Sequence, residues 1–597
     1  MTMIKLAVLM LMSFAMFGTA SAQINAPVSE PSRPNIVLIL ADDLGYSDIG
    51  PFGSEINTPN LSALAENGIR FSNYHTAASC APSRSMLLTG VDSHRAGVPN
   101  IPEAIPPEQI TQTNYQGVLS KNVVTVATLL EDQGYHTVMA GKWHLGMEPD
   151  QLPSSRGFKR TITMADTGAD NWEQRPYLPI YKKANWFADG KETTLPDDFY
   201  SSELLVDKTI EFIEEKQDKQ PFFAYIPFQA VHIPVQSPKH FTDKYLDTYS
   251  DGWDALRKQR QSKAVALGHV PADSQMVKMQ STADWQSLDE EEKRYQSKRM
   301  AVYAGMVEAM DHHIGRLVEH LKQSGQYDNT VFIFTSDNGA EYNGWNDQLN
   351  LRNRLLQWYM GYSLDLDNLG LKGSFNAIGP SFASAAASPL SFYKFYSGEG
   401  GLRVPLIIAG DPIAANNAHS RAFTFVTDIT PTILELSNIT RPESRYGGRT
   451  IEPIIGKSLI PLLNGNAERV YNESDTVAYE IGGNAALFQD DYKIMKNRGP
   501  MGGDQWQLFN IALDPGETVN LAEDMPERFE SMLGLYDDYV QKNGVLPVSA
   551  EYVQIVQVFI NGFRDVQGMR LLVLVLSGLV VMLVVLTAYS VRVKNRT

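Results

Sequence analysis

Two pairs of neighbouring residues, Asp42-Asp43 and Asp337-Asn338, place oxygen ligands at two distant points of a chain of 597 residues. Carboxylate and amide oxygens suit calcium or magnesium, whereas zinc and copper prefer nitrogen and sulfur ligands. A single acidic pair at the end of a strand more often belongs to a turn than to a metal site. Two such pairs, each after a predicted strand, favour a site for calcium or magnesium.

The only cysteine, Cys80, opens the run CAPSRSMLLTG at residues 80–90. A lone thiol cannot form an internal disulfide, and there is no second cysteine to build a soft-metal site. Pro82 and the short run to Gly90 suit a helix that starts just after Cys80, and the first amide groups of that helix would attract an anion. The presence of this single cysteine therefore indicates either a chemical role of its thiol or a position without special function.

Three other segments carry basic side chains within distinctive runs. A lone histidine in a loop or a lysine on a surface is usually solvated. These residues are therefore chosen as candidates because of the sequence around them, and not because of their residue type. The candidates are Lys142 and His144 in the run GKWHLG, His232 after the apolar stretch 222–226, and Lys394 shortly before the run EGGLRVP.

Short apolar runs alternate with helical patterns along the first 440 residues. Residues 300–323 carry apolar side chains at three- to four-residue spacing, which predicts a helix. The predicted strands are residues 35–40, 137–140, 222–226, 331–334 and 406–409. This alternation predicts an α/β fold with a large mixed β-sheet sandwiched by helices. Ligands of such sheets bind at the carboxyl ends of strands, so the two acidic pairs are expected to share one site.

From about residue 441 the chain changes to short segments separated by glycines. Antiparallel strands are predicted at residues 477–479, 485–488 and 492–495, followed by a helix at 526–542. We therefore expect a larger domain over residues 33–440 and a smaller C-terminal α+β domain over 441–545. Residues 546–568 form a weakly amphipathic connector, for which docking on the body is preferred to lying on a membrane. The Ala/Ser-rich stretch 381–388 is predicted to be a loop.

Both ends of the chain carry targeting signals. Residues 1–22 have the charge, the apolar stretch and the Ala-Ser-Ala ending of a signal peptide. The apolar stretch is shorter than the ~20 residues of a membrane span, which disfavours an uncleaved anchor. Residues 569–591 predict a transmembrane helix, because the run 571–589 is apolar, uncharged and flanked by basic residues. The basic tail 592–597 is then cytoplasmic; a cleaved surface-sorting signal is the alternative.

The net charge of −17 gives a soluble body that repels polyanions, so nucleic acid is not expected as a partner. An anionic substrate must instead be held by local cations.

These runs together resemble the type I sulfatase family, the formylglycine-dependent branch of the alkaline phosphatase superfamily, and are closest to bacterial arylsulfatases. The resemblance rests on PNIVLILADD at 34–43, CAPSR at 80–84, GKWHLG at 141–146 and TSDNG at 335–339, and it extends from about residue 33 to 545. The family's usual proline before the substrate-facing histidine is Val231 here, and the C-terminal membrane segment is not a usual part of the family.

The resemblance implies an alkaline-phosphatase-like fold in which residues 33–440 form the catalytic sulfatase domain. It implies that a formylglycine-generating maturation enzyme oxidises Cys80 to formylglycine. It also implies a calcium site, with magnesium less favoured, formed by Asp42, Asp43, Asp337, Asn338 and modified Cys80.

The resemblance further assigns roles to the basic residues. Arg84 steadies the modified residue, and His144 assists deprotonation and collapse of the aldehyde hydrate. His232 protonates the leaving alcohol or phenol, and Lys394 contacts the sulfate group. Arg84, Lys142 and Lys394, with the divalent cation, would stabilise the charge that develops when the S–O bond breaks.

The expected activity is hydrolysis of sulfate monoesters by a protein at the periplasmic face of the inner membrane, anchored by one C-terminal helix. A eukaryotic luminal location is the less favoured alternative. Two other functions stay open: a phosphonate monoester or phosphodiester hydrolase of the same superfamily, and a membrane-tethered binder of sulfated ligands without catalysis.

Overall fold

A computed structural model describes residues 33–178, 180–344, 351–414 and 416–565. Its main feature is an 11-stranded mixed sheet with the order β10-β2-β9-β8-β1-β7-β3-β4-β5-β6, in which β11 also pairs with β2. The strands are β1 Asn35–Ala41, β2 Gly68–His75, β3 His136–Lys142, β4 Arg160–Met164, β5 Trp186–Ala188, β6 Lys191–Glu192, β7 Phe222–Pro227, β8 Thr330–Ser336, β9 Arg403–Ala409, β10 Ala418–Ser420 and β11 Thr424–Phe425. The five predicted strands and the mixed sheet are confirmed.

The centre of the sheet is parallel and completely buried. Strand β1 pairs in parallel with both β7 and β8, and all seven of its residues are buried. Burial on both faces explains why β1 and β8 are continuous apolar runs in the sequence without alternation. The register pairs Ala41 with Ser336, so that the chain leaves both strands at the same edge of the sheet.

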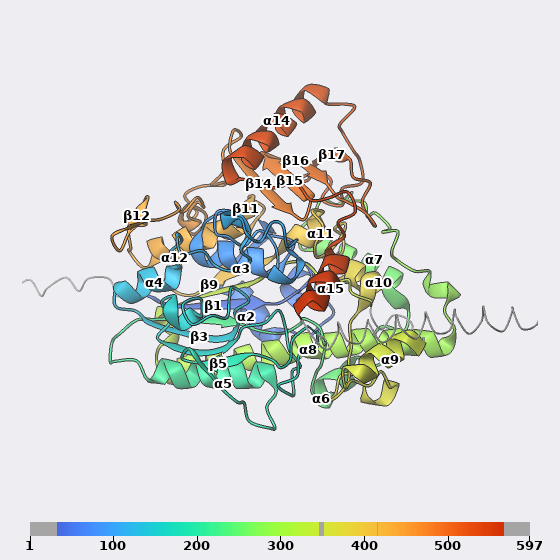
Figure 1. The fold of residues 1–597 in the computed structure, drawn as a ribbon, viewed down its shortest axis with the longest axis horizontal. Coiled ribbons are helices and arrows are strands. Elements are labelled where there is room, and N and C mark those ends of the chain that lie inside the picture. Colours follow the sequence, from blue (N-terminus) through green and yellow to red (C-terminus); the bar gives the residue numbers. More distant parts are fainter. Residues whose placement is uncertain (1–32, 179, 345–350, 415, 566–597) are drawn as a thin grey trace, which may run out of the picture. The chain divides into compact units, whose positions relative to one another are not determined.

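Helices cover both faces of this sheet (Figure 1). On one side lie α3 (Cys80–Thr89), α4 (Val126–Asp132) and α12 (Ile429–Leu436), and on the other lie α5 (Ser201–Glu214) and α8 (Glu290–Gln323). Helix α8 begins ten residues before the predicted helix, because Asp289 and Glu292 form a capping box at its start. Helices α2 (Pro59–Glu66) and α7 (Gly252–Ala266) pack against α8 and α10, respectively.

The prediction of a loop at residues 381–388 is wrong. Helix α10 spans Gly379–Ala386, with Pro380 in its first turn, and packs on α7. Alanine has the highest helix propensity, and small side chains allow close packing of the two helices.

A separate four-stranded antiparallel sheet follows near the C-terminal end. Its strands are β14 (Thr476–Ile481), β15 (Asn484–Gln489), β16 (Tyr492–Lys496) and β17 (Trp506–Asn510), in sequential order. Helix α14 (Pro526–Asn543) packs on this sheet over its own apolar core. The three predicted strands and the helix are confirmed, and β17 is an additional strand; the domain boundary at residue 440 stays a prediction.

The chain then forms α15 (Gln554–Asp565), which packs against the short 3₁₀ turn η2 (Pro102–Ala104). The side-chain amide of Asn561 donates hydrogen bonds to the backbone carbonyls of Glu103 and Ile105, at 2.8 and 2.9 Å. The connector therefore docks on the body, as predicted.

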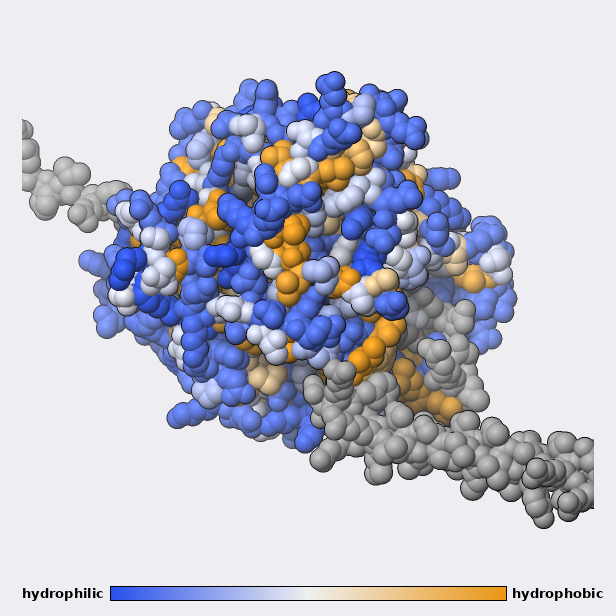
Figure 2. Space-filling model, turned by 45° about the horizontal axis from the view of Figure 1, so that its top comes forward, coloured by the Kyte–Doolittle hydropathy of each residue, from blue (hydrophilic) through white to orange (hydrophobic). Residues whose placement is uncertain are grey.

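Within the described ranges, no helix combines the length and the apolar character needed to cross a bilayer. The predicted signal peptide, the transmembrane segment 569–591 and the tail 592–597 lie outside the described residues. On the face drawn in Figure 2, hydrophilic residues predominate and apolar side chains gather in small patches, in keeping with the net charge of −17.

Candidate active site

The two acidic pairs meet at the carboxyl edge of the sheet. The Asp43 backbone N–H donates to Asp337 Oδ1 at 3.2 Å, and Asn338 Nδ2 donates to Asp43 Oδ1 at 2.7 Å. Asp43 has a left-handed backbone with a φ of 63°, which is uncommon for a residue other than glycine and turns its carboxylate toward the site. The predicted convergence of Asp42, Asp43, Asp337 and Asn338 is confirmed.

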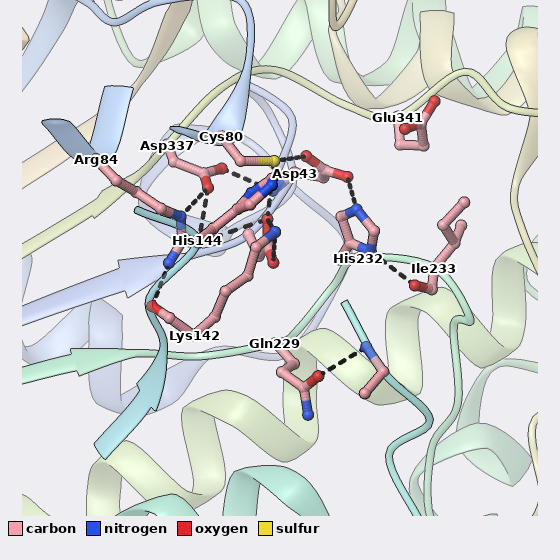
Figure 3. A network of polar contacts seen from close by, with 12 residues as sticks. Asp43, Cys80, Arg84, Lys142, His144, Gln229, His232, Ile233, Asp337 and Glu341 are labelled. Atoms are coloured by element: carbon pink, nitrogen blue, oxygen red, sulfur yellow. Dashed lines mark hydrogen bonds and ion pairs between the residues drawn. The ribbon is translucent and has the colours of Figure 1, made fainter. Parts of the chain in front are cut away.

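Cys80 is the first residue of α3, and its buried thiol points at the first acidic pair (Figure 3). Its Sγ lies 3.4 Å from Asp42 Oδ1 and 3.6 Å from Asp43 Oδ1. Burial, followed by the charge of Asp337, raises the pKa of the thiol well above its usual value, so the unmodified residue is a neutral thiol. A neutral thiol is a poor nucleophile.

Arg84 lies one helical turn after Cys80, on the same face of α3. Its Nε and Nη2 donate to Asp337 Oδ2 at 2.9 and 2.7 Å, and its Nη1 donates to the Lys142 carbonyl at 2.8 Å. Although burial opposes the charge, Asp337 and Asp42 raise the pKa of Arg84. The guanidinium thus links α3, β8 and β3 beside Cys80.

Two buried lysines neutralise the first acidic pair. Lys142, the last residue of β3, places Nζ 2.9 and 2.7 Å from the two oxygens of Asp42. Lys394 places Nζ 2.8 Å from Asp43 Oδ2 and 3.2 Å from Glu341 Oε2. Burial nevertheless raises the pKa of Asp42, against the attraction of Lys142. We call the assembled group the strand-end cluster: Asp42, Asp43, Cys80, Arg84, Lys142, Asp337, Asn338 and Lys394.

His144 follows β3 in a turn that requires glycine nearby. A side chain at Gly141 would place Cβ 1.9 Å from the Pro227 carbonyl oxygen, and His144 itself has a φ of 57°. Its Nε2 lies 3.3 Å from Glu103 Oε2. Burial lowers the pKa of His144, so its ring is neutral. Although burial opposes the charge of Glu103, its interactions with His144 and Tyr181 together lower its pKa, so Glu103 is ionised and Nε2, which faces it, carries the proton. Nδ1 is then an acceptor, and it is buried without a hydrogen-bond partner among the described residues.

His232 follows β7 and faces the strand-end cluster from the other side (Figure 3). Its Nδ1 donates to the Ile233 carbonyl at 2.6 Å, and its Nε2 lies 3.6 Å from Asp43 Oδ2. Burial and the charges of Lys142 and Lys394 lower the pKa of His232 well below its usual value. The ring is therefore neutral, with the lone pair of Nε2 toward the carboxylates.

The donors at this edge fit a hard divalent cation. Ligand atoms of Asp42, Asp43, Cys80 and His232 all lie within 4.8 Å of one another. Asn338 Oδ1 is buried and accepts no hydrogen bond from the described residues, which leaves one oxygen free for an ion. The carboxylate oxygens of Asp42, Asp43 and Asp337 all accept hydrogen bonds, from Lys142, from Asn338 and Lys394, and from Arg84 and the Asp43 backbone, respectively. Carboxylate and amide oxygens are the ligands that calcium and magnesium prefer.

A cavity of about 230 Å³ adjoins this cluster and shares Lys394 with it. Its lining is mainly apolar; the apolar residues include Ile101, Leu178, Ile233, Phe395, Ile555 and Val558. The last two belong to α15. The cavity also touches Glu103 and Glu341, so it extends from the partner of His144 to the partner of Lys394.

No sequence motif indicated Glu103 or Glu341. Glu341 lies two residues after the run TSDNG, and this position could have suggested a place at the same edge. Glu103 lies in the short 3₁₀ turn η2 among prolines, where no motif marks it. Its contact with His144 arises only from the tertiary fold.

Comparison with known proteins agrees with this site. Residues 34–439 match the family described as Sulfatase. The chain is 37% identical over 541 residues to an uncharacterized sulfatase of Schizosaccharomyces pombe, which covers 88% of this chain and 96% of the relative. It is 35% identical to an arylsulfatase of Klebsiella aerogenes over 73% of this chain and 93% of the relative.

Among solved structures, Ps i-CgsB in complex with k-i-k-neocarrahexaose superposes with a TM-score of 0.61 at 23% identity, over 89% of this chain and 97% of that chain. This likeness concerns the fold alone. The family match and the identity with two sulfatases over most of their lengths establish the family: this chain belongs to the sulfatases.

Proposed function

We propose that the chain hydrolyses sulfate monoesters to an alcohol or phenol and inorganic sulfate, with a formylglycine derived from Cys80 and a calcium ion. Membership of the family makes it a sulfuric ester hydrolase. One observation carries the finer proposal: Cys80 begins α3 with its Sγ 3.4 Å from Asp42, inside a buried group of carboxylates and cations.

The two groups that the family resemblance implies would supply what the neutral thiol lacks. A formylglycine hydrate offers one hydroxyl to attack sulfur and a second whose deprotonation releases sulfate. Calcium, held by Asp42, Asp43, Asn338 and the modified residue, would add positive charge beside the sulfate oxygens. Asp337, which also pairs with Arg84, is the fifth residue of this proposed calcium site.

The chain's own cations are placed to bind the anion. Arg84, Lys142 and Lys394 are all buried, and each contacts a carboxylate of the strand-end cluster. In such a site, fixed positive charges stabilise the developing negative charge with little reorganisation. Lys394 also lines the cavity, so it is the cation nearest to where an ester would enter.

The two histidines have different tasks. His144 Nδ1 is a buried lone pair held in orientation by Glu103, which suits a base that takes a proton from the hydrated residue. His232 is neutral, so Nε2 must gain a proton before it can protonate the leaving oxygen. The negative charge of a bound sulfate ester favours that protonation.

Peptide mass spectrometry across Cys80, in protein purified from its native host, tests the proposal. We expect formylglycine at position 80 and turnover of 4-nitrophenyl sulfate that the Cys80→Ala variant lacks. Unmodified cysteine in exported protein would instead favour the sulfated-ligand binder. Faster turnover of a phosphodiester than of an aryl sulfate would favour the phosphodiesterase.

Location is part of the proposal. We infer export and anchorage by residues 569–591 at the periplasmic face of the inner membrane, from the sequence of both ends. Fractionation of the host is expected to recover the full chain in the membrane pellet, and a chain ending at residue 565 in the periplasmic fraction.

A further inference from the structure

We propose that α15 is a specificity element of the active site, and that the cavity it closes accepts the apolar alcohol part of a sulfate ester, of about one aromatic ring. This inference rests on the proposed hydrolysis, because Lys394 must mark the sulfate end of the cavity.

Helix α15 lies well beyond residue 439, where the match to the family ends. Its inner face nevertheless reaches the site, since Gln554, Ile555 and Val558 line the cavity next to Lys394. Polar contacts fix the helix there: Gln554 Nε2 donates to Asn100 Oδ1 at 2.6 Å, and Asn561 binds the backbone on both sides of Ala104. These contacts hold the apolar wall at a set distance from the cluster.

The cavity is lined by both charged and apolar side chains. Lys394 lies 2.8 Å from Asp43, next to the carboxylates around Cys80, and Glu103 and Glu341 are the other charged residues of the lining. Ile101, Ile555 and Val558 provide apolar surface, and the Phe395 ring lies 5.3 Å from Lys394 Nζ. An anion with a hydrocarbon substituent matches this arrangement, because burial of the hydrocarbon stabilises the complex while the sulfate stays among the cations.

The volume limits the size of that substituent. An apolar cavity of about 150 Å³ in another protein accommodates benzene. The present cavity of about 230 Å³ therefore has room for one ring with substituents, or for a short alkyl chain. Ligand pockets for larger molecules measure about 300–1,000 Å³. A polyhydroxylated sugar would also lose hydrogen bonds against the isoleucine and valine side chains.

The role of α15 as a wall of the cavity can be tested by ligand binding without turnover. The protein is the full chain carrying Cys80→Ala, in a buffer that contains calcium. The probes are 4-nitrophenyl sulfate, glucose 6-sulfate and inorganic sulfate, each measured by calorimetry. We expect Ile555→Asn to weaken binding of the aryl ester about tenfold, since one misplaced group in an apolar pocket costs about that factor or more. Binding of inorganic sulfate should stay within twofold.

Val556→Asn is the matched control. Val556 is the next residue of the same helix and is 49% exposed, so the same polar change falls on the outer face. It should leave all three affinities unchanged. Because Ile555 is only half-buried, its variant is expected to fold, and its melting temperature checks that. Ile555→Trp, which fills the cavity, should weaken aryl-ester binding as well.

Three results would overturn the inference: unchanged aryl-ester affinity in both Ile555 variants, parallel losses for ester and inorganic sulfate, or tighter binding of glucose 6-sulfate than of the aryl ester. Failure of the proposed function is a different result, namely no turnover of any sulfate ester by the parent chain with formylglycine at position 80.

Discussion

Two of the buried charge clusters in the described chain differ in how they pair the carboxylates around a central lysine. The first is the strand-end cluster. The second, which we call the sheet-joining cluster, connects the large sheet to the C-terminal sheet and consists of His75, Glu399, Arg403, Lys493 and Glu517. Each is centred on a buried lysine between two carboxylates: Lys394 between Asp43 and Glu341, and Lys493 between Glu399 and Glu517.

The sheet-joining cluster satisfies all four carboxylate oxygens at its centre. Lys493 contacts one oxygen of each glutamate, at 2.9 and 2.7 Å. His75 contacts the other oxygen of Glu399, and the Glu399 N–H and the Ser391 hydroxyl donate to the other oxygen of Glu517. Carboxylates that are fully paired in this way suit a structural role. His75 Nδ1 is nevertheless buried and has no hydrogen-bond partner among the described residues.

The active site is built less completely. Asn338 Oδ1 and His144 Nδ1 are buried and have no hydrogen-bond partner in the described part of the chain, and a cavity opens beside Lys394. An unpaired buried polar atom lowers the stability of the folded protein by about 1–3 kcal/mol. A ligand that supplied the missing contacts of these two atoms would therefore bind favourably. Buried charge alone therefore does not distinguish an active site from a structural contact between sheets, whereas the gathering of possible metal ligands from Asp42, Asp43, Cys80 and His232 does.

Among the variants considered, Lys394→Met is expected to reduce the activity most. It removes the cation that lies at the entrance of the site, and kcat/KM for aryl sulfate is expected to fall about 10³-fold. The change also leaves the buried carboxylates of Asp43 and Glu341 without their cation, so the melting temperature should fall too, and kcat/KM is measured at low temperature on protein that stays folded. Lys394→Arg is the control and should retain part of the activity; full activity in Lys394→Met would refute the role.

Lys493→Met should show the opposite pattern. It leaves Glu399 and Glu517 as uncompensated buried charges, which costs about 3–5 kcal/mol in the free energy of unfolding. Urea unfolding measures this loss. Turnover of the protein that stays folded at low temperature should match the parent, and a specific loss of kcat would mean that the two clusters are not separate.

His94 offers a pH test of the contact between the body and the C-terminal sheet. Its Nε2 lies 2.9 Å from Glu480 Oε2 of β14. Although burial opposes the charge, Asp92 and Glu480 raise the pKa of His94 to about 9. The charged form is thus favoured in the folded state, and its contribution is complete below about pH 6.5 and is lost as the pH rises to about 9.

The size of this contribution is at most about 3 kcal/mol. The difference in unfolding free energy between the parent and His94→Gln should accordingly shrink from pH 6 to pH 9.5. Groups common to both proteins cancel in this difference. A constant difference would show that His94 does not titrate with the fold.

Removal of calcium tests whether Asn338 Oδ1, the unpaired oxygen of the strand-end cluster, binds the ion. Chelation should lower stability by about 2.7 kcal/mol relative to calcium at 100 times its Kd, and added calcium should restore it. Asn338→Leu should lose most of this response, while Lys493→Met should keep it. If the melting temperature is the same with and without calcium in the parent, the strand-end cluster does not bind the ion.

Glu103→Gln should have the smallest effect. Loss of the carboxylate lowers the pKa of His144 further and weakens its orientation, so kcat should fall about tenfold, part of what a positioned base contributes. The acid limb of the kcat–pH profile should move to lower pH. The hydroxyl of Tyr181 donates a hydrogen bond to Glu103 Oε1, and Tyr181→Phe leaves the carboxylate in place, so this variant should not move the limb. An unmoved limb in Glu103→Gln would exclude the positioning role.

The sequence predicted the centre of the site well, because apolar strands that end in acidic residues leave a clear pattern. Asp42 and Asp337 were expected together, and β1 and β8 are neighbours. The sequence was a poorer guide to helices whose apolar residues do not recur at regular spacing. The first turns of α8 are almost wholly polar, and α10 is built from small residues, so neither shows an apolar stripe.

Other features depend on contacts between distant parts of the chain. Glu103 meets His144 only because α15 and η2 pack on the body beside the turn after β3. The local sequence around Glu103 or His144 does not indicate this tertiary contact. The role of Ile555 as a cavity wall is hidden for the same reason.

The position of α15 has a consequence for where the enzyme finds its substrate. The last described residue of the helix is Asp565, and five residues lie between it and the apolar run that begins at residue 571, a reach of about 20 Å at most. Under the proposed anchorage, the wall of the cavity cannot drift far from the lipid headgroups. The enzyme would then draw its esters from a thin layer at the bilayer surface, where amphiphilic sulfates accumulate far above their concentration in bulk water.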